Sequence, residues 1–259
     1  MGRIGLWTLS KYYLTHNTSI LLMIPIIIHT HSEYSFLWPA AIPLLEKYAK
    51  GFPIVWCCDS LLDFKLPDSW TLYTYSKEAP WSERIKGCLQ TIDSDYVIYL
   101  NEDMLLIDTL SEEKIEHCLE FMRTNNSEFV MSFVWNNRPG YINSKYKDYV
   151  FVKMFSHYIH PAIWKKTLLN ELCSLKLNTN ENESPQTYNI TSKRNCYGLA
   201  HTKFQTELST RSLFFPHMHA IYQGKWTFYR YPYLKALLES YGIDTTKRQV
   251  DDTWMVEYR

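Results

Sequence analysis

Short apolar runs alternate with amphipathic stretches along the chain, which is the pattern of an α/β domain. Strands are expected at about residues 20–29, 53–58, 71–75, 96–101, 129–134 and 150–155. The runs IPIII, PIVWCC and YVIYL are almost continuously apolar, as in strands buried on both faces of a mostly parallel sheet. Helices are expected at 36–50, 81–92, 111–125, 161–175 and 232–241. Ser111 is a candidate N-cap, and Asn125 and Asn126 would end that helix.

The organisation of the chain predicts one domain. Its 259 residues suffice for a large core, and no repeat or linker divides them. We expect a single domain over residues 1–259, with residues 1–19 as an N-terminal extension. The segment 176–195 is polar and rich in Asn, Ser and Thr, so we expect a flexible lid loop there.

Composition narrows the range of partners and compartments. With 27 Lys and Arg against 27 Asp and Glu, the formal net charge is zero, and no global field would attract nucleic acid. Six scattered cysteines without metal-site spacing predict buried thiols in a reducing compartment, hence a cytoplasmic protein. The apolar stretch 20–28 is too short for a transmembrane segment. The 9 Trp and 20 Tyr residues offer surfaces for sugars, and the oligomeric state stays open.

The segment DSDYVIYLNEDMLLID, residues 93–108, carries the strongest chemical signal. Its buried strand would deliver Asn101, Glu102 and Asp103 to the carboxyl edge of the sheet, where open α/β sheets bind ligands. Oxygen ligands at this edge suit Mg²⁺ or Mn²⁺ held together with a diphosphate. The alternative is an ordinary acidic loop after a strand.

The run YVIYLNED resembles the strand and DxD motif of GT-A glycosyltransferases. The segments WSERIKGCLQTIDSDYVIYLNED, HPAIWKKTLL, ESPQTYN and HAIYQGKW resemble short GT-A-like enzymes of bacteria and large DNA viruses. The resemblance implies a GT-A-like, Rossmann-like domain with a mostly parallel central sheet flanked by helices. It also implies a metal-dependent glycosyltransferase that moves a sugar from a nucleotide-diphosphate sugar, a UDP-sugar first among them, to a hydroxyl of a glycan acceptor.

The same resemblance, with the chemistry of the residues, assigns roles around the donor. Asp103 and His219 would bind Mn²⁺ or Mg²⁺, with His217 as an alternative to His219. The remaining donor-binding residues would be His29, Asp59, Arg84, Asn101, Glu102 and Lys225. Asp59 would lie near the nucleotide base, while Arg84 and Lys225 would bring positive charge to the diphosphate. Asn101 stands where the motif usually has its first carboxylate, so Asp103 is the surer ligand.

A catalytic base is harder to assign. In the similar enzymes the Ser-Pro segment continues to an aromatic residue and a Glu, whereas here it continues to Tyr188 and Asn189. We choose Glu183 in the expected lid as the base, and Asp148, His157 and His160 stay open as alternatives. Arg84 and Asp103 complete the expected catalytic set.

Two other function classes remain open. The stretch IIIHTHSEYS resembles the first metal motif of polymerase-and-histidinol-phosphatase hydrolases, in which His29 and His31 would bind metal. After the second strand, however, Asp59 is followed by no histidine, so we expect His29 to line a nucleotide pocket instead. A non-catalytic carbohydrate-binding protein of the same fold is the third possibility, because Asn101 and Asn189 replace expected carboxylates.

Overall fold

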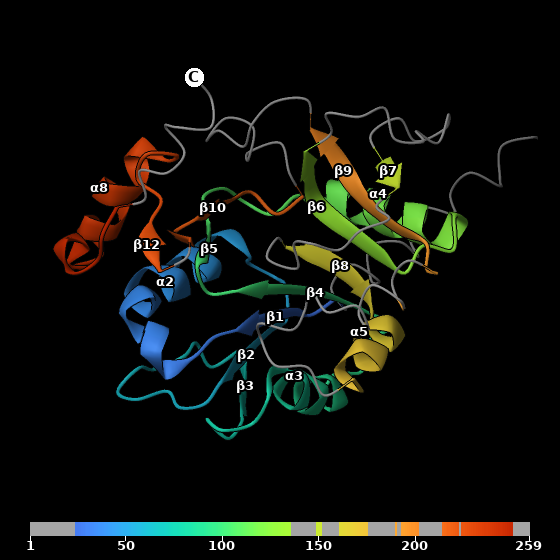
Figure 1. Ribbon diagram of the computed structural model, residues 1–259, viewed down its shortest axis with the longest axis horizontal. Coiled ribbons are helices and arrows are strands. Elements are labelled where there is room, and N and C mark those ends of the chain that lie inside the picture. The colour runs from blue at the N-terminus through green and yellow to red at the C-terminus, as the bar shows by residue number, and fades with distance from the viewer. Residues whose placement is uncertain are drawn as a thin grey trace, which may run out of the picture.

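An eight-stranded sheet forms the centre of the molecule, with the strand order β3-β2-β1-β4-β8-β6-β9-β7 (Figure 1). The computed structural model describes residues 24–135, 149–151, 161–175, 190, 193–201, 214–222 and 224–250. The strands are β1 (Ile26–His29), β2 (Ile54–Cys58), β3 (Thr71–Thr74), β4 (Tyr96–Asn101), β6 (Phe129–Trp135), β7 (Tyr149–Phe151), β8 (Ala162–Lys165) and β9 (Cys196–His201).

Strands β1 to β4 run parallel to one another, and β8 and β7 are the antiparallel members of the sheet. The order 3-2-1-4 of the parallel strands is that of a Rossmann-like nucleotide-binding half. The predicted α/β class with a mostly parallel central sheet flanked by helices is confirmed.

Helices cover both faces of this sheet. One face carries α2 (Trp38–Tyr48), α4 (Glu112–Thr124) and α8 (Pro232–Ser240), which share a core with Ile26 and Ile28 of β1. The other carries α3 (Trp81–Gln90) and α5 (Lys166–Cys173), which share a core with Ile27. Because successive strand residues point to opposite faces, burial on both sides explains why three consecutive Ile residues begin β1. In the described part of the chain, no helix has the length and apolar character needed to cross a bilayer.

Two short sheets extend the structure beyond β4. In the first, β5 (Met104–Leu106) pairs antiparallel with β10 (His217–His219), and in the second β11 (Ile221–Tyr222) pairs with β12 (Lys225–Trp226). Two 3₁₀ turns, η1 (Ser32–Leu37) and η3 (Thr245–Lys247), complete the described elements. These additions bring the C-terminal part of the chain against the end of β4.

The predicted helix 161–175 is wrong in its first part. Ala162–Lys165 is the strand β8, which pairs antiparallel with both β4 and β6, and α5 begins only at Lys166. A short apolar run is compatible with either a strand or a helix. Here the backbone pairing with β4 on one side and β6 on the other makes it a strand. The cap of α4 is confirmed, since the Ser111 hydroxyl accepts a hydrogen bond from Lys114 N at 3.2 Å. The expected lid 176–195 lies largely outside the described residues, and so does the extension 1–19.

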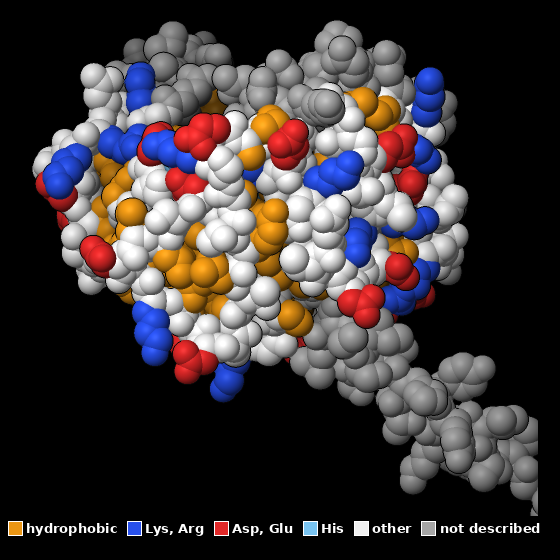
Figure 2. Space-filling model, turned by 90° about the horizontal axis from the view of Figure 1, so that it is seen from below, with side chains coloured by type: hydrophobic (Ala, Val, Ile, Leu, Met, Phe, Trp, Pro, Cys, Tyr) orange, Lys and Arg blue, Asp and Glu red, His pale blue; other side chains and the backbone are white. Residues whose placement is uncertain are grey.

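The edge strand β3 is the most exposed strand of the parallel half. Figure 2 shows hydrophobic side chains gathered on the face seen from below, the side on which β3 lies in Figure 1. Leu72 of β3 is 43% exposed, and Leu62 in the preceding loop is 58% exposed. The neighbouring Trp70 is half-buried and stacks on Trp56, with ring centroids 5.8 Å apart. Leu62 and Leu72 are thus exposed apolar side chains at this edge, in the part of the chain that the structure describes.

Gly87 in the middle of α3 is explained by the close approach of β3. A Cβ atom at this position would overlap the Tyr73 hydroxyl. Gly87→Ala is therefore expected to destabilise the protein by about 1–2 kcal/mol, although Ala normally favours a helix over Gly by about 1 kcal/mol. In a Tyr73→Ala background the same change should become stabilising. Urea unfolding of the four proteins of this cycle tests the prediction, and additive effects of the two substitutions would contradict it.

Candidate functional site

The carboxyl ends of β1 and β4 meet at the point where the strand order reverses. From β1 the chain proceeds to β2 and β3 on one side, and β4 then lies on the other side of β1. The register places His29 of β1 opposite Asn101 of β4. Open α/β sheets bind ligands in the crevice at such a reversal. The residues after β1 and β4 are therefore the candidate site, and the sequence had singled out both segments.

Asp103 and His219 lie side by side at this edge. His219 Nε2 is 2.8 Å from Asp103 Oδ2, although 116 residues separate them in the sequence. Both side chains are largely buried, with 5% of the His219 side chain and 14% of the Asp103 side chain exposed. The structure thus brings together the two residues expected to bind a metal.

The small sheet of β5 and β10 creates this contact. Glu102 and Asp103 form the turn between β4 and β5, and His219 pairs with Met104 directly after that turn. Ala220 N donates to Asp103 O at 2.7 Å, and the Thr227 hydroxyl donates to His219 O. The backbone on both sides of the pair is thereby fixed, so the two side chains are held together by strand pairing.

One carboxylate oxygen of Asp103 is available to a ligand. Its Oδ1 is buried and has no hydrogen-bond partner among the residues that the structure describes. A buried carboxylate oxygen without a partner is costly unless a ligand satisfies it. In the described part of the chain, no group of three His, Cys, Asp or Glu side chains is placed to hold a metal. A carboxylate and an imidazole fit a cation whose other ligands are diphosphate oxygens and water.

Glu102, the middle residue of the motif, differs in character from Asp103. It is buried, and burial followed by the negative charge of Asp103 raises its pKa well above the ordinary value of a glutamate. A raised pKa means that the folded site favours the protonated form of Glu102 more than water does. Asp103, and not Glu102, is the carboxylate that contacts His219.

Asn101 and His29 lie together on the α3 side of the sheet. Tyr99 Oη is 3.5 Å from Asn101 Oδ1, and the His29 ring stacks on the Tyr99 ring with centroids 6.3 Å apart. His29 Nε2 is buried without a hydrogen-bond partner in the described part of the chain. Asn101 forms no hydrogen bond with Asp103, so the three residues of the motif face different surroundings.

The buried ring of His29 should make stability sensitive to acid. Burial, aided by the positive charge of Arg84, lowers the pKa of His29 from 6.5 to about 3. Below pH 6.5 the unfolded chain binds a proton that the folded protein does not, so stability falls as the pH falls toward 3. His29 should account for about 3 kcal/mol of the loss between pH 7 and pH 4.

Urea unfolding at pH 7 and pH 4 tests this prediction on the wild type and His29→Gln. The variant should lose less stability than the wild type, whereas the control His117→Gln, at an exposed position of α4, should follow the wild type. Equal losses in His29→Gln and the wild type would show that the ring does not titrate as described.

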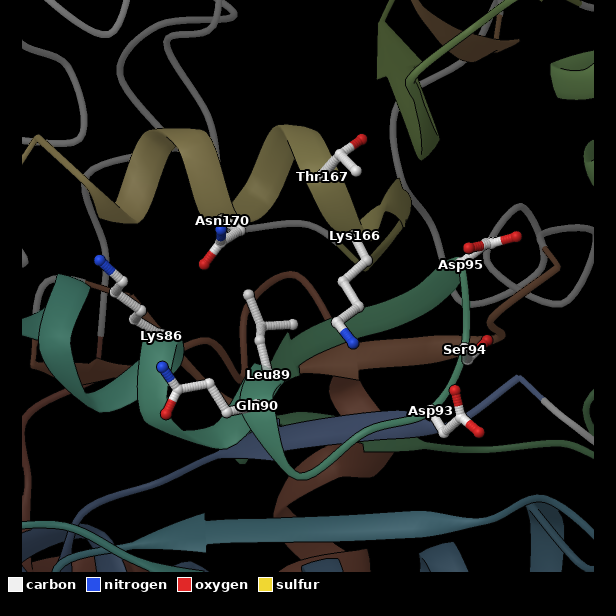
Figure 3. Close-up of a pocket in the computed structure, with 9 residues that line it drawn as sticks. All are labelled: Lys86, Leu89, Gln90, Asp93, Ser94, Asp95, Lys166, Thr167 and Asn170. Carbon is white, nitrogen blue, oxygen red and sulfur yellow. The ribbon is translucent and has the colours of Figure 1, made fainter.

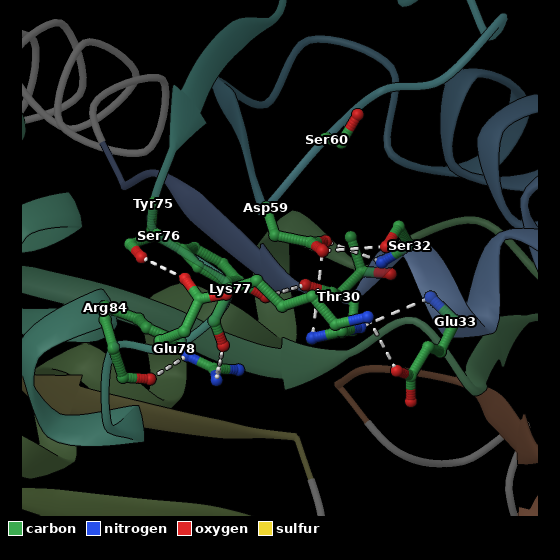
Figure 4. Close-up of polar contacts among 12 residues, drawn as sticks. Thr30, Ser32, Glu33, Asp59, Ser60, Tyr75, Ser76, Lys77, Glu78 and Arg84 are labelled. Atoms are coloured by element: carbon green, nitrogen blue, oxygen red, sulfur yellow. Dashed lines mark hydrogen bonds and ion pairs between the residues drawn. The ribbon is translucent and has the colours of Figure 1, made fainter.

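Asp59 fixes the loop after β1 (Figure 4). Its carboxylate accepts hydrogen bonds from Ser32 N at 2.6 Å and Ser32 Oγ at 2.7 Å, and His31 Nε2 lies 3.7 Å away. Burial alone would raise the pKa of Asp59, but the hydrogen bonds from Ser32 outweigh burial and hold the pKa below its usual value. A carboxylate has about four lone-pair positions, and the two hydrogen bonds from Ser32 use two of them. His31 is engaged with Asp59 and with the start of η1.

Arg84 organises the loop between β3 and α3 (Figure 4). Its Nε donates to Ala79 O at 2.6 Å, its Nη2 donates to Lys77 O at 2.8 Å, and its guanidinium lies 4.8 Å from the centroid of the Tyr75 ring. Lys77 in turn forms an ion pair with Glu33 of η1 at 2.9 Å. Two of the five N–H donors of Arg84 are thus committed to backbone carbonyls of the loop.

Several expected site residues do not enter this description. Glu183, Asp148, His157 and His160 lie outside the described residues. Lys225 lies on β12, half-buried, in the hairpin that follows His219, and forms no ion pair with a described residue. His217 is buried on β10, and its Nδ1 lies 2.7 Å from Phe215 O, so His219 rather than His217 contacts Asp103.

Thr30 and Tyr34 belong to the site although the sequence did not single them out. Thr30 accepts hydrogen bonds from Tyr75 Oη at its carbonyl and from Trp38 Nε1 at its hydroxyl, the latter at 2.8 Å. Burial and the charges of Glu102 and Asp103 raise the pKa of Tyr34. Both residues lie within the stretch IIIHTHSEYS, and this position is the signal that could have pointed to them.

A cavity of about 580 Å³ lies at the opposite edge of the sheet (Figure 3). Figure 3 shows its lining from α3, the loop before β4 and the start of α5, including Lys86, Asp93 and Lys166. The Lys166 ammonium donates to Ile92 O, so this charge is engaged in the fold. The cavity lies at the amino-terminal end of β4, away from Asp103.

No protein-family model matches the sequence, and no curated protein matches it. Among solved structures, a cytidylyltransferase from Leptospira borgpetersenii is 13% identical, with a TM-score of 0.44 over 70% of this chain and 77% of that chain. TarS 1-349 of S. aureus in complex with UDP is 14% identical, with a TM-score of 0.43 over 68% of this chain and 58% of that chain. The match to a longer TarS chain spans 35% of it. Structural similarity at this level does not indicate the function of the chain. The function is therefore inferred from the residues of the site.

Proposed function

We propose that the chain is a metal-dependent glycosyltransferase that moves a sugar from a nucleotide-diphosphate sugar, with a UDP-sugar first among the candidates, to a hydroxyl of a glycan acceptor. The observation that carries the proposal is the pair of Asp103 and His219, 2.8 Å apart at the reversal of strand order. The unpartnered Asp103 Oδ1 supports it as well.

Each part of the site has a role in this proposal. Asp103 and His219 hold Mn²⁺ or Mg²⁺, which when bound neutralises the charge that develops on the leaving diphosphate. Arg84 and Lys225 add positive charge to the same group. Asp59 and His29 line the nucleotide, and Asn101 and Glu102 lie beside the donor.

The acceptor hydroxyl needs a base if the reaction inverts the sugar. Glu183 is our choice for this base on the strength of the sequence alone. Glu102 is less suited, because its side chain is buried.

A thermal-shift screen of the full, metal-stripped chain tests the proposal. The panel contains UDP-, GDP-, CMP- and dTDP-sugars, each with and without Mn²⁺. We expect one sugar nucleotide to stabilise the protein only when Mn²⁺ is present, by about 2.7 kcal/mol at 100 times its dissociation constant. Absence of any stabilisation by nucleotides, with or without Mn²⁺, would contradict the proposal.

A further inference from the structure

Lys77 and Glu33 form an ion pair between the loops that follow β3 and β1 (Figure 4). Lys77 Nζ lies 2.9 Å from Glu33 Oε1. In the sheet β2 lies between β3 and β1, and Asp59 directly follows the end of β2. The pair therefore joins the loops on both sides of Asp59, at the edge of the sheet where open α/β folds bind ligands.

The backbone at both ends of this pair is held in place. On the β3 side, Arg84 Nη2 donates to Lys77 O at 2.8 Å. On the β1 side, Ser32, the residue before Glu33, donates from its backbone N to Asp59 Oδ1 at 2.6 Å. Lys77 and Glu33 can thus change partners by rotation of their side chains, without movement of the loops.

The ion pair itself is the weak member of this network. The Lys77 side chain is 54% exposed and that of Glu33 is 65% exposed. Two exposed side chains lose rotational freedom when they pair, and water and salt screen their attraction, so such pairs contribute little to stability. A diphosphate carries more negative charge than a single carboxylate and therefore attracts a lysine more strongly.

Contacts connect Lys77 with two residues of the proposed donor site. Its carbonyl accepts the hydrogen bond from Arg84, which we assign to the diphosphate. Its partner Glu33 donates from the backbone N to His31 Nδ1 at 3.3 Å, and His31 Nε2 lies 3.7 Å from Asp59, which we assign to the nucleotide. The lysine ammonium, on its flexible four-carbon stem, is suited to bind a phosphate between these two residues.

We propose that Lys77 is a ligand of the donor's diphosphate and that Glu33 pairs with this lysine when no nucleotide is bound. Donor binding exchanges the Glu33 carboxylate for a phosphate, and no covalent bond changes in the exchange. The inference rests on the proposed function, because it names a further residue of the same donor site.

Titration calorimetry on the full chain with Mn²⁺ tests the role of Lys77. The probes are UDP, GDP and dTDP, each compared with its nucleoside. Lys77→Gln should weaken binding of the diphosphate that the wild type prefers by at least about threefold, the effect of one exposed charge contact, and should leave nucleoside binding unchanged. The control Lys65→Gln removes another exposed lysine, which pairs with Asp68 at 3.8 Å, and should leave diphosphate binding unchanged.

Glu33→Gln tests the exchange. Removal of the carboxylate frees Lys77, so diphosphate binding should become tighter by at least about twofold. In the Lys77→Gln background the same change should have a clearly smaller effect, because no lysine is left to release. Asp68→Asn, which frees Lys65 in the loop before β3, is the matched control and should leave binding unchanged.

Diphosphate binding that is unchanged in Lys77→Gln, or nucleoside binding that falls as much as diphosphate binding, would overturn the inference. An equal gain from Glu33→Gln with and without Lys77 would also overturn it, since Glu33 would then act by repulsion alone. If the wild type binds a diphosphate in a way that depends on Asp103 but not on Lys77, this inference alone is rejected. Failure of the wild type to bind any of the three diphosphates contradicts the proposed function, and this inference with it.

Discussion

Asp103→Ala is expected to abolish metal-dependent binding of the sugar nucleotide and to lower the transfer rate by at least about a hundredfold. Asp103 is the carboxylate of the motif that contacts His219, and its Oδ1 has no hydrogen-bond partner among the described residues. No other carboxylate contacts His219 among the described residues, so nothing nearby replaces it. Binding of the nucleotide with and without Mn²⁺, and transfer to an acceptor, measure the effect.

A matched control separates this effect from a general loss of charge. Asp93→Ala removes an acidic side chain at the opposite end of β4, in the lining of the other cavity, and should leave donor binding unchanged (Figure 3). His219→Ala should weaken metal binding while keeping the carboxylate. Wild-type activity in Asp103→Ala would remove the pair from the mechanism.

Trp38→Ala is expected to cost about 3–5 kcal/mol of stability, a large part of the roughly 5–15 kcal/mol that holds a domain of this kind together. Trp38 is fully buried at the start of α2 and packs edge-on against Trp56 and Phe64, with centroids 5.7 and 5.2 Å away. It also donates the hydrogen bond to the Thr30 hydroxyl beside the site. Urea unfolding measures the loss.

Trp70→Ala provides the comparison for Trp38. Trp70 is half-buried and stacks on the same Trp56, so its truncation should cost clearly less. A loss below about 1 kcal/mol in Trp38→Ala, or one equal to that of Trp70→Ala, would contradict the packing described.

The parallel half of the fold could be predicted because its strands are buried on both faces. Runs such as IVWCC and YVIYL admit few other interpretations when they are separated by amphipathic stretches. The strand β8 could not be predicted, because its four residues adopt extended backbone only where β4 and β6 offer open edges. Its sequence is equally compatible with the first turn of the helix that follows.

The site was predictable in part for a similar reason. Because Asn101, Glu102 and Asp103 stand at the end of a buried strand, the sequence predicted polar groups at the sheet edge. The resemblance to GT-A enzymes suggested His219. The burial of Glu102 was not visible in the sequence, since it depends on the turn between β4 and β5.

The most direct test is the ³¹P magnetic resonance of a protein-bound nucleotide diphosphate titrated with Mn²⁺. If Asp103 and His219 hold the cation against the diphosphate, Mn²⁺ will broaden both phosphorus signals in the wild type at stoichiometric metal. The broadening will be lost in Asp103→Ala and kept in His31→Ala. Broadening that survives in Asp103→Ala but disappears in His29→Ala or His31→Ala would place the metal after β1 and contradict the account.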